Sequence, residues 1–448
     1  MTRMAASRQQ GRSRPTPTEI GTSIELFTGG GGLAQAMHNA GFRHLLCNES
    51  AKRACETLRE NGAIDWSTGL NQDRSINDSW PLIEGDIREL VDGGRFEKSV
   101  FKNLEGKVDV VAGGPPCQPF SLGGVHKGDE DARNMFPELF RVVRETRPKA
   151  IVCENVRGLL RPSFNDYFKY ILNELRAPFE ERDDSEEWSD HNGRLLDILK
   201  HDPSDPSERY SVYPITVNAA DYGVPQVRNR IIIVAFRNDL AVDWKTPIST
   251  HSEASLWEDQ DPESGGYWDR HGTSPSTHHL ERFRRPSSLD LEEARTRLPW
   301  RTLRDALSYA PEDLAGTLEG IQPHPLPEIA PGESHPHFFH HIGWPGARIY
   351  KGHTPNLLDR PAKTVKAGVH GVPGGENVLL KDDGTHRYMT VREVARAMTF
   401  PDQWLLSGPR TEQMRQLGNA VPVRLGEVFA RAVAEALYPM TAMRAAVS

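Results

Sequence analysis

Short runs of apolar, mostly β-branched residues recur in the first half of the chain, separated by longer stretches with helical periodicity. The runs are SIELF at 23–27, VDVVAG at 108–113, AIVCEN at 150–155 and RIIIVAF at 230–236. Strands that are apolar on both faces and alternate with helices are typical of a parallel sheet covered on both sides. The pattern therefore predicts a doubly wound α/β domain, with ligands gathered at the carboxyl ends of its strands.

Other parts of the chain have a different pattern. Residues 245–300 are rich in Ser, Pro, His, Asp and Trp without clean periodicity, and we expect an irregular insertion there. Residues 180–209 hold 11 acidic and 4 basic side chains, which predicts a second, solvated insertion. Helices are expected at 302–308, 391–398 and 424–437.

Charge and cysteine usage narrow the functional classes. The net charge of the 448 residues is −8, which is unusual for a protein that contacts phosphates. Residues 180–209 alone contribute −7, whereas residues 345–424, with 12 bases and 7 acids, carry +5, so we expect the C-terminal third to face any polyanion. The spacing of the four cysteines fits neither a disulfide framework nor a zinc site, and no apolar stretch is long enough to span a bilayer. These features predict a soluble, cytoplasmic protein.

A glycine cluster follows the first predicted strand, in ELFTGGGGLAQAM at 25–37. The glycines let the backbone turn tightly and approach a ligand closely. A nucleotide-type ligand and a simple strand-to-helix turn explain this cluster equally well. Glu49 and Asp86, at the ends of later strands, offer oxygens for ribose hydroxyls and for an adenine amino group.

The sharper signal is GGPPCQPFS at 113–121, which directly follows a buried strand. Two glycines and two prolines make a rigid turn that presents the thiol of Cys117. A lone cysteine is ordinarily an inert buried residue, but rigid presentation is what a nucleophile needs. We therefore interpret Cys117 as a nucleophile.

Six motifs, in order along the chain, resemble those of the cytosine-5 DNA methyltransferase family, of the bacterial type II restriction-modification type. They are GPPCQPFS at 114–121, ENV at 154–156, QVRNR at 226–230, RPAKT at 360–364, TVREVARAMTFPD at 390–402 and GNAVP at 418–422. The resemblance covers most of the chain except the two insertions. It implies a Rossmann-like doubly wound S-adenosylmethionine-dependent methyltransferase sheet with a smaller target recognition domain.

The same resemblance implies a domain plan. The catalytic domain would span 20–245 and be completed by 415–441, after a flexible tail at 1–19. An irregular insertion at 246–300 would precede the target recognition domain and hinge at 301–414.

Roles for individual residues also follow from the resemblance. Cys117 would be the nucleophile, while Glu154, Arg228 and Arg230 would hold the target base. Arg360 and Thr364 would support the recognition domain. The S-adenosyl-L-methionine pocket would be lined by Phe27, Gly29, Gly32, Glu49, Asp86, Ile87, Pro116, Asn419 and Val421.

The chemistry of cytosine requires such groups for independent reasons. Carbon 5 is too poor a nucleophile to take a methyl group from a sulfonium, so a thiolate must first add to carbon 6. A carboxyl such as Glu154, whose protonation apolar surroundings would favour, assists by protonating or hydrogen-bonding ring nitrogen 3. The base must leave the duplex stack to be reached. LGGVHKGDEDARNMF at 122–136 resembles the family's mobile loop, the alternative being an ordinary surface loop.

Three residues depart from the commoner family pattern. Glu25 stands where Asp is usual, Gly30 replaces an apolar residue, and Met398 stands where Gln is common; we expect tuning of the site rather than loss of activity. The cluster HPHFFHH at 335–341 has two histidines at helical spacing but no cysteine or HExxH partner, so we expect no metal.

The resemblance places base reading in a span that includes roughly 300–360, with Arg348, Lys351 and His353 as candidate contacts to double-stranded DNA. A tRNA cytosine-5 methyltransferase is one alternative, but that branch carries a further cysteine motif and no cysteine follows Cys153. A catalytically silent DNA-binding homologue is the other. We expect a monomer, and a separately encoded restriction endonuclease is a possible partner because this chain has no nuclease motif.

Overall fold

The computed structural model describes most of the 448-residue chain. The described residues are 17–66, 74–92, 99–116, 134–183, 185–201, 205–283, 287, 292, 296–347, 354–367 and 377–439. Among the helices of these segments, none is long and apolar enough to cross a membrane.

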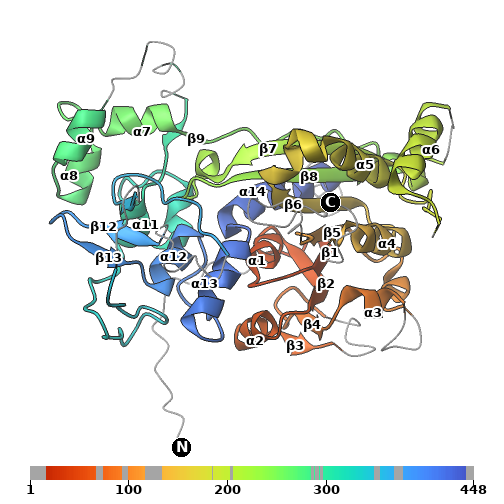
Figure 1. Ribbon diagram of the computed structural model, residues 1–448, viewed down its shortest axis with the longest axis horizontal. Helices are drawn as coiled ribbons and strands as arrows, with labels where there is room; N and C mark the ends of the chain where they lie inside the picture. The colour runs from red at the N-terminus through yellow and green to blue at the C-terminus, as the bar shows by residue number, and fades with distance from the viewer. Residues whose placement is uncertain are drawn as a thin grey trace, which may run out of the picture.

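A large sheet forms the centre of the molecule (Figure 1). Its eight strands lie in the order β3-β4-β2-β1-β5-β6-β8-β7. They are β1 (Gly21–Leu26), β2 (Phe42–Glu49), β3 (Ile64–Asp65), β4 (Pro81–Glu84), β5 (Val110–Gly113), β6 (Ala150–Val156), β7 (Tyr210–Asn218) and β8 (Asn229–Arg237). All pairings from β3 to β6 are parallel, as expected for strands that are buried on both faces.

The four strands that the hydrophobic pattern predicted are present, but one prediction about them is wrong. β8, the strand of RIIIVAF, pairs antiparallel with β6 and with β7. Its apolar run is continuous because the sheet is covered on both faces there, and not because its neighbours are parallel. The apolar pattern therefore predicted the strand correctly, but it did not predict whether the strand runs parallel or antiparallel to its neighbours.

Two layers of helices cover the sheet. The first contains α3 (Ile87–Val91), α4 (Phe136–Thr146) and α5 (Asn165–Arg176), and the second contains α1 (Gly32–Asn39) and α14 (Val423–Leu437). Apolar side chains alternate along the strands between these layers: Ile151 and Ile233 face the first, whereas Val152 and Val234 face the second. The doubly wound architecture follows from this alternation.

The two ends of the described chain meet in the second layer, where α14 lies against α1 (Figure 1). A Cβ atom added to Gly426 of α14 would lie 2.7 Å from the Cβ atom of Ala36 in α1. The absence of that atom allows the helices to approach closely. The expected helix at 424–437 is therefore confirmed, and it packs in the second helical layer over the sheet.

The acidic insertion is more ordered than expected. It contains α6 (Trp188–His201), which packs on α5 through the buried side chains of His191 and Leu195. His191 lies 3.2 Å from the Glu174 carboxylate, which also accepts a 2.6 Å hydrogen bond from Tyr170. The outer face of this helix is solvated, as predicted, whereas its inner face is packed, which the charge pattern did not predict.

Residues 245–300 also contain regular structure, which the irregular pattern did not predict. The helices α7 (Glu253–Asp259), α8 (Tyr267–His271) and α9 (Thr277–Arg282) follow β9 (His251–Ser252), which pairs with β10 (Leu298–Pro299). Short elements of five to seven residues carry too few turns to show a helical period. Their small core is built from Leu256, Tyr267, Trp268 and Trp300.

Most of the described residues between 301 and 409 form a smaller lobe, which Figure 1 shows beside the sheet. Its elements are α11 (Leu303–Ser308), η9 (Pro311–Ala315), β11 (Asn356–Leu357), β12 (Val378–Leu380), β13 (His386–Tyr388) and α12 (Val391–Ala397), and α2 (Lys52–Glu60) and α13 (Arg410–Asn419) pack beside it. The expected helices at 302–308 and 391–398 are confirmed. Each begins with a capping box, formed by Thr302 with Asp305 and by Thr390 with Glu393.

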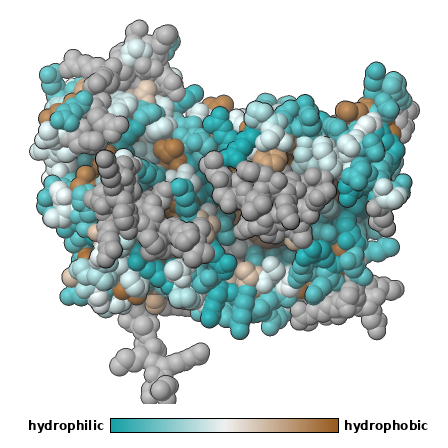
Figure 2. Space-filling model, in the orientation of Figure 1, coloured by the Kyte–Doolittle hydropathy of each residue, from teal (hydrophilic) through white to brown (hydrophobic). Residues whose placement is uncertain are grey.

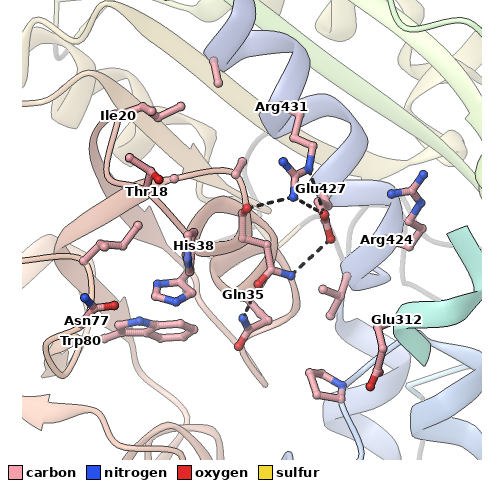
Figure 3. Close-up of a pocket in the computed structure, with 18 of the residues that line it drawn as sticks. Thr18, Ile20, Gln35, His38, Asn77, Trp80, Glu312, Arg424, Glu427 and Arg431 are labelled. Atoms are coloured by element: carbon pink, nitrogen blue, oxygen red, sulfur yellow. Dashed lines mark hydrogen bonds and ion pairs between the residues drawn. The ribbon is translucent and has the colours of Figure 1, made fainter. Parts of the chain in front are cut away.

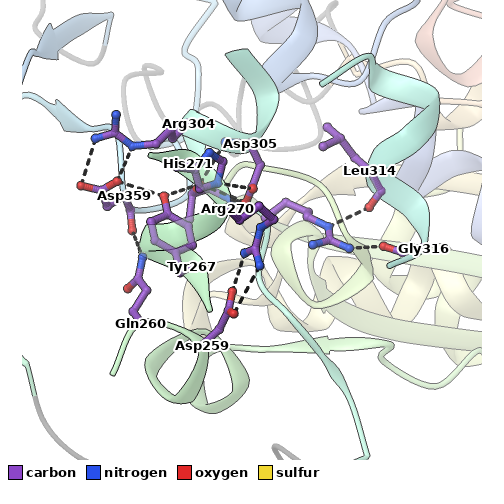
Figure 4. A network of polar contacts seen from close by, with 12 residues as sticks. Asp259, Gln260, Tyr267, Arg270, His271, Arg304, Asp305, Leu314, Gly316 and Asp359 are labelled. Carbon is purple, nitrogen blue, oxygen red and sulfur yellow. Dashed lines mark hydrogen bonds and ion pairs between the residues drawn. The ribbon is translucent and has the colours of Figure 1, made fainter. Parts of the chain in front are cut away.

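A polar network joins α8 to α11 (Figure 4). His271 lies 2.9 Å from the Asp305 carboxylate, and both side chains are almost fully buried. Burial raises the pKa of Asp305, but the hydrogen bond and charge of His271 and the charge of Arg301 outweigh it and lower the pKa to about 2. Tyr267 donates to Asp359 at 2.9 Å in the same network. The helices of the insertion are thus fixed to the smaller lobe.

We predict that His271→Leu destabilises this lobe by about 3–5 kcal/mol, because it leaves the ionised Asp305 buried without its partner. The free energy of unfolding, measured by urea denaturation with tryptophan fluorescence, tests this. Glu258→Ala, at an exposed site on α7, is the control. Equal urea midpoints for the two variants would contradict the prediction.

Candidate functional site

The carboxyl ends of β1, β5 and β6 lie at one rim of the sheet, as predicted. These three strands are adjacent and parallel. The rim therefore brings together the glycine turn after β1, the GGPP turn after β5, and Glu154 and Asn155 in β6. β2 and β4 extend the same rim with Glu49 and Asp86.

The glycine turn has a backbone conformation that most side chains disfavour. Phe27 has φ 54°, Gly29 has φ 56° and Gly31 has φ 90°. A left-handed conformation costs energy for Phe27, and the surrounding hydrogen bonds offset that cost. Gly29 N–H donates to the Glu49 carboxylate at 2.7 Å, and Thr28 N–H donates to the Asn48 carbonyl at 3.0 Å.

The C-terminal segment closes this turn from the other side. A Cβ atom on Gly32 would lie 2.2 Å from the Val421 carbonyl oxygen. Gly32 and Val421, which are far apart in sequence, are therefore in contact, as expected if both line one pocket. Asn419, the last residue of α13, is exposed, whereas Val421 is 6% exposed. The Val421 carbonyl fills the space beside Gly32, so this contact requires glycine there. Beside Gly29, in contrast, an added Cβ atom would meet only the Phe27 carbonyl, at 3.9 Å, and this open side of the turn leaves room for a flat ligand close to the backbone.

The two acids at the rim already have protein partners. Glu49 accepts hydrogen bonds from Gly29 N–H and from Ala51 N–H, both at 2.7 Å, one on each oxygen. Asp86 caps α3 by accepting from Arg88 N–H at 3.0 Å, and it is also paired with the Arg88 guanidinium. The hydrogen bond from Arg88 lowers the pKa of Asp86. Both are positioned as anionic acceptors, and their contacts with a cofactor stay a prediction.

The structure shows the surroundings of the three residues that depart from the family pattern. Glu25 is 1% exposed at the end of β1, and burial raises its pKa well above the usual value. A Cβ atom on Gly30 would lie 3.4 Å from Cβ of Gln416, an ordinary contact distance. The Met398 sulfur accepts a 3.1 Å hydrogen bond from the side-chain amide of Gln226. Each residue is accommodated without an evident clash.

The acid that is predicted to hold the base lies beside the predicted nucleophile turn. Glu154 is 7% exposed, and its Oε1 lies 2.7 Å from Nε of Arg230. A guanidinium therefore contacts this carboxylate, so its surroundings are not wholly apolar. The two groups are not aligned for a hydrogen bond, so Glu154 Oε1 has no hydrogen-bond partner among the described residues. Pro116 is exposed at this rim, and Cys117 lies outside the described residues.

Arg228 has a different environment from Arg230. Its guanidinium is 1% exposed and donates to the carbonyls of Val365 (3.2 Å), Gly418 (2.8 Å) and Ala420 (2.9 Å). Burial, and then the charge of Arg230, lowers its pKa, while Glu154 raises it. In this structure Arg228 joins the QVRNR segment to the segments that flank Asn419, and its contact with a base stays a prediction.

The residues expected to support the recognition lobe do contact its surroundings. Arg360 pairs with Glu253 and lies 4.6 Å from the ring centroid of Trp257, so it also holds α7. Thr364 donates to the Val227 carbonyl at 2.7 Å. The candidate DNA contacts Arg348, Lys351 and His353 lie outside the described residues, as does most of the loop at 122–136.

The histidine cluster is not helical, contrary to what its spacing suggested. His341 contacts Thr390 at 2.9 Å and the Pro327 carbonyl at 2.7 Å, and it is fully buried. His340, with φ 62°, contacts Leu406 N–H at 2.9 Å. These histidines tie residues 327–341 to the lobe core.

Three residues that the sequence reading did not select contribute to the rim. Trp404 donates to the Gly30 carbonyl at 3.1 Å, and a Cβ atom on Gly31 would lie 2.6 Å from its ring. Gln416 accepts from Thr57 at 2.6 Å behind the same turn. Asn155 donates to the Pro115 carbonyl at 3.1 Å. Asn155 lies within the ENV motif and Trp404 follows the TFPD turn by two residues, so both had a signal in the sequence, whereas nothing in the sequence marked Gln416.

A groove of about 1130 Å³ lies elsewhere, at the opposite end of the strands (Figure 3). Thr18 and Ile20 precede or begin β1, and His38 lies near the end of α1. Arg424 and Glu427 line the groove from α14. Most of the groove therefore lies away from the rim where the sequence placed the cofactor, although Trp404, which contacts Gly30 and Gly31 at the rim, also lines it.

The surface seen in Figure 2 is largely hydrophilic. The positive charge counted in residues 345–424 is nevertheless only partly at the surface. Arg392 and Arg396 are 0% exposed, and Arg396 is paired with Asp402 at 2.6 Å. Arg387 is paired with Glu393 at 2.6 Å. The charge count along the sequence therefore overstated the positive charge that this segment exposes to a polyanion.

Comparison with known proteins agrees with this geometry. The family model described as "C-5 cytosine-specific DNA methylase" matches residues 21–177 and 190–435. The type II methyltransferase M.NgoMIV of Neisseria gonorrhoeae is 29% identical over 93% of this chain and 98% of its own length. M.Eco47II of Escherichia coli is 29% identical over 93% of this chain and 79% of its own. A solved DNMT2 mutant from Spodoptera frugiperda has a similar fold, with TM-score 0.50 and 15% identity over 92% of this chain and 99% of that one.

We predict that Gly32→Ala weakens binding of S-adenosyl-L-homocysteine at least about tenfold. The added methyl group meets the Val421 carbonyl, a backbone atom that cannot rotate away, and overpacking of this kind costs about 1–3 kcal/mol. Isothermal titration calorimetry measures the affinity. Gly193→Ala is the control, since a Cβ there meets nothing within 4 Å. An affinity within twofold of the unsubstituted protein would refute the prediction.

Proposed function

Because the chain belongs to the C-5 cytosine-specific DNA methylase family, we propose that it methylates carbon 5 of a cytosine flipped out of duplex DNA, through a covalent bond to Cys117. The chain is a DNA (cytosine-5) methyltransferase that uses S-adenosyl-L-methionine, related to enzymes of type II restriction-modification systems. The covalent route, the flipped base and a short specific target sequence are the proposal.

One observation carries the proposal: Glu154 and Arg230 lie together at the rim that also bears the turn leading to Cys117. A cytosine ring presents a nitrogen 3 and an amino group on one edge and a carbonyl oxygen beside them. A carboxylic acid matches the first two groups, and a guanidinium matches the oxygen. Glu154 Oε1 is ion-paired with Arg230 at 2.7 Å, so the proposed base is met by a carboxyl and a guanidinium that already lie side by side.

The protein groups then act in sequence. When bound, S-adenosyl-L-methionine supplies an electrophilic methyl group on a sulfonium. The Cys117 thiolate adds to carbon 6 while Glu154 donates a hydrogen bond or proton to nitrogen 3, so electron density moves to carbon 5. Arg230 stabilises the charge that develops on the carbonyl oxygen. After methylation, loss of the carbon 5 proton to water or a weak base reforms the double bond and expels the thiolate.

The cofactor is held by the glycine turn and its neighbours. The Val421 carbonyl packs against Gly32 and fixes the turn, and the open side of the turn at Gly29 is the proposed surface for the nucleoside. Glu49 and Asp86 offer anionic oxygens for ribose hydroxyls and the adenine amino group, and Phe27, Ile87, Pro116 and Asn419 complete the proposed lining. These assignments rest on the family motifs and on the location of all of these residues at one rim.

The proposed substrate is double-stranded DNA in the cytoplasm, with the smaller lobe reading the target sequence. Arg348, Lys351 and His353 are the proposed contacts in that lobe. We also propose a separately encoded restriction endonuclease as partner and a monomeric enzyme, since one flipped base occupies one site. The silent-homologue alternative is disfavoured by the presence of the thiol, the glutamate and the cofactor glycines together.

Bisulfite sequencing of mixed-sequence duplex DNA incubated with the enzyme and S-adenosyl-L-methionine tests the proposal. We predict 5-methylcytosine at one short motif, no product with Cys117→Ser, and a rate about 10²–10⁴-fold lower with Glu154→Gln. Cys55→Ala, which removes a buried thiol on α2, is the matched control and is expected to retain activity. Methylation by Cys117→Ser would exclude the covalent route, and methylation of tRNA alone would exclude the DNA substrate.

A further inference from the structure

The turn that carries the proposed nucleophile has few backbone hydrogen bonds of its own. It comprises Gly113, Gly114, Pro115 and Pro116, and a proline has no N–H to donate. Gly113 is still paired with Cys153 in the sheet. Beyond that point, the turn must be held by contacts that reach its carbonyls.

Asn155 supplies such a contact. Its side chain is 3% exposed, and its Nδ2 donates to the Pro115 carbonyl at 3.1 Å. Its Oδ1 accepts from Val156 N–H at 2.8 Å, which fixes the orientation of the amide. The amide therefore joins the end of β6 to the residue two positions before Cys117.

Glu154 is held against the same turn. A Cβ atom on Gly114 would lie 3.4 Å from the Glu154 carbonyl and 3.7 Å from its carboxylate. The base-holding carboxylate and the amide that holds the nucleophile turn are thus consecutive residues of one strand. Their separation is set by strand geometry, so any shift of the Pro115 anchor changes the distance from thiol to base.

We propose that Asn155 is a positioning residue that sets the location of the Cys117 thiol relative to the base held by Glu154. This inference rests on the proposed covalent function. Asn155 lies behind the turn, against its backbone, and acts through Cys117. Its loss should slow bond formation between sulfur and carbon 6 while leaving the binding of DNA and cofactor intact.

Duplex DNA with 5-fluorocytosine at the target isolates this step. The thiolate forms its bond to carbon 6, and carbon 5 takes the methyl group. Because fluorine replaces the proton that would leave, the thiolate is not expelled and the adduct persists. Its rate of formation, at saturating DNA and S-adenosyl-L-methionine, is read on denaturing gels. Dissociation constants for the DNA and for S-adenosyl-L-homocysteine, and the melting temperature, are measured in parallel.

Two variants and one control complete the experiment. Asn155→Ala removes both hydrogen bonds, and Asn155→Asp keeps the acceptor for Val156 N–H but places an anion against the Pro115 carbonyl. Asn173→Ala is the control: Asn173 is 4% exposed on α5, and its amide also has two partners, Asn192 at 2.9 Å and Arg176 at 2.7 Å, away from the rim. Asn173 matches Asn155 in burial, and its substitution likewise removes a buried side-chain amide that donates one hydrogen bond and accepts another.

We expect the adduct to form about 100-fold more slowly in both Asn155 variants, with both dissociation constants within about threefold of the original and no such loss in Asn173→Ala. An unchanged rate in either folded Asn155 variant, or a loss explained by weaker binding or by the melting temperature, overturns the inference alone. Absence of any adduct with the unsubstituted protein overturns the proposed function, and this inference with it.

Discussion

The guanidinium of Arg228 joins three segments that lie far apart in sequence. It is fully buried, and its N–H groups reach the carbonyls of Val365, Gly418 and Ala420. A buried guanidinium is costly unless its donors are bonded, so these carbonyls must stay where they are. Because Gly418 and Ala420 flank Asn419, and Val421 packs against Gly32, the cofactor side of the rim depends on this one cation.

Close packing against the backbone also shapes the rest of the rim. At Gly32 the Val421 carbonyl occupies the space that a side chain would need, and Trp404 fills the corresponding space beside Gly31. Phe27 is held in a left-handed conformation by this packing. Conformations of this kind persist only where the surroundings determine them, and they cluster at functional sites. A site preorganised in this way loses little conformational freedom when a ligand binds.

Charged side chains form contacts in the interior of this protein as well as on its surface. Arg392 and Arg396 are buried, and Arg396 donates to backbone carbonyls from several segments, including those of Tyr309 and His324. Asp305 and His271 fix the helices of the insertion to the smaller lobe. These interactions link segments that have few large apolar side chains. They also explain why the positive balance of the C-terminal third is a poor measure of its attraction for DNA.

The sequence by itself determined four of the eight strands of the central sheet, the three main later helices and the family, because buried strands, capping signals and short motifs are local patterns. The order in which strand ends deliver Gly29, Glu154 and the GGPP turn to one rim followed from the rule for parallel sheets. Only the tertiary structure decided the direction of β8, the docking of α6 and the helices between 245 and 300. It also decided the partners of Arg228, Glu154 and Asn155. Each of these depends on contacts between residues distant in sequence, and a local pattern carries no information about which distant carbonyl or carboxylate will be within reach.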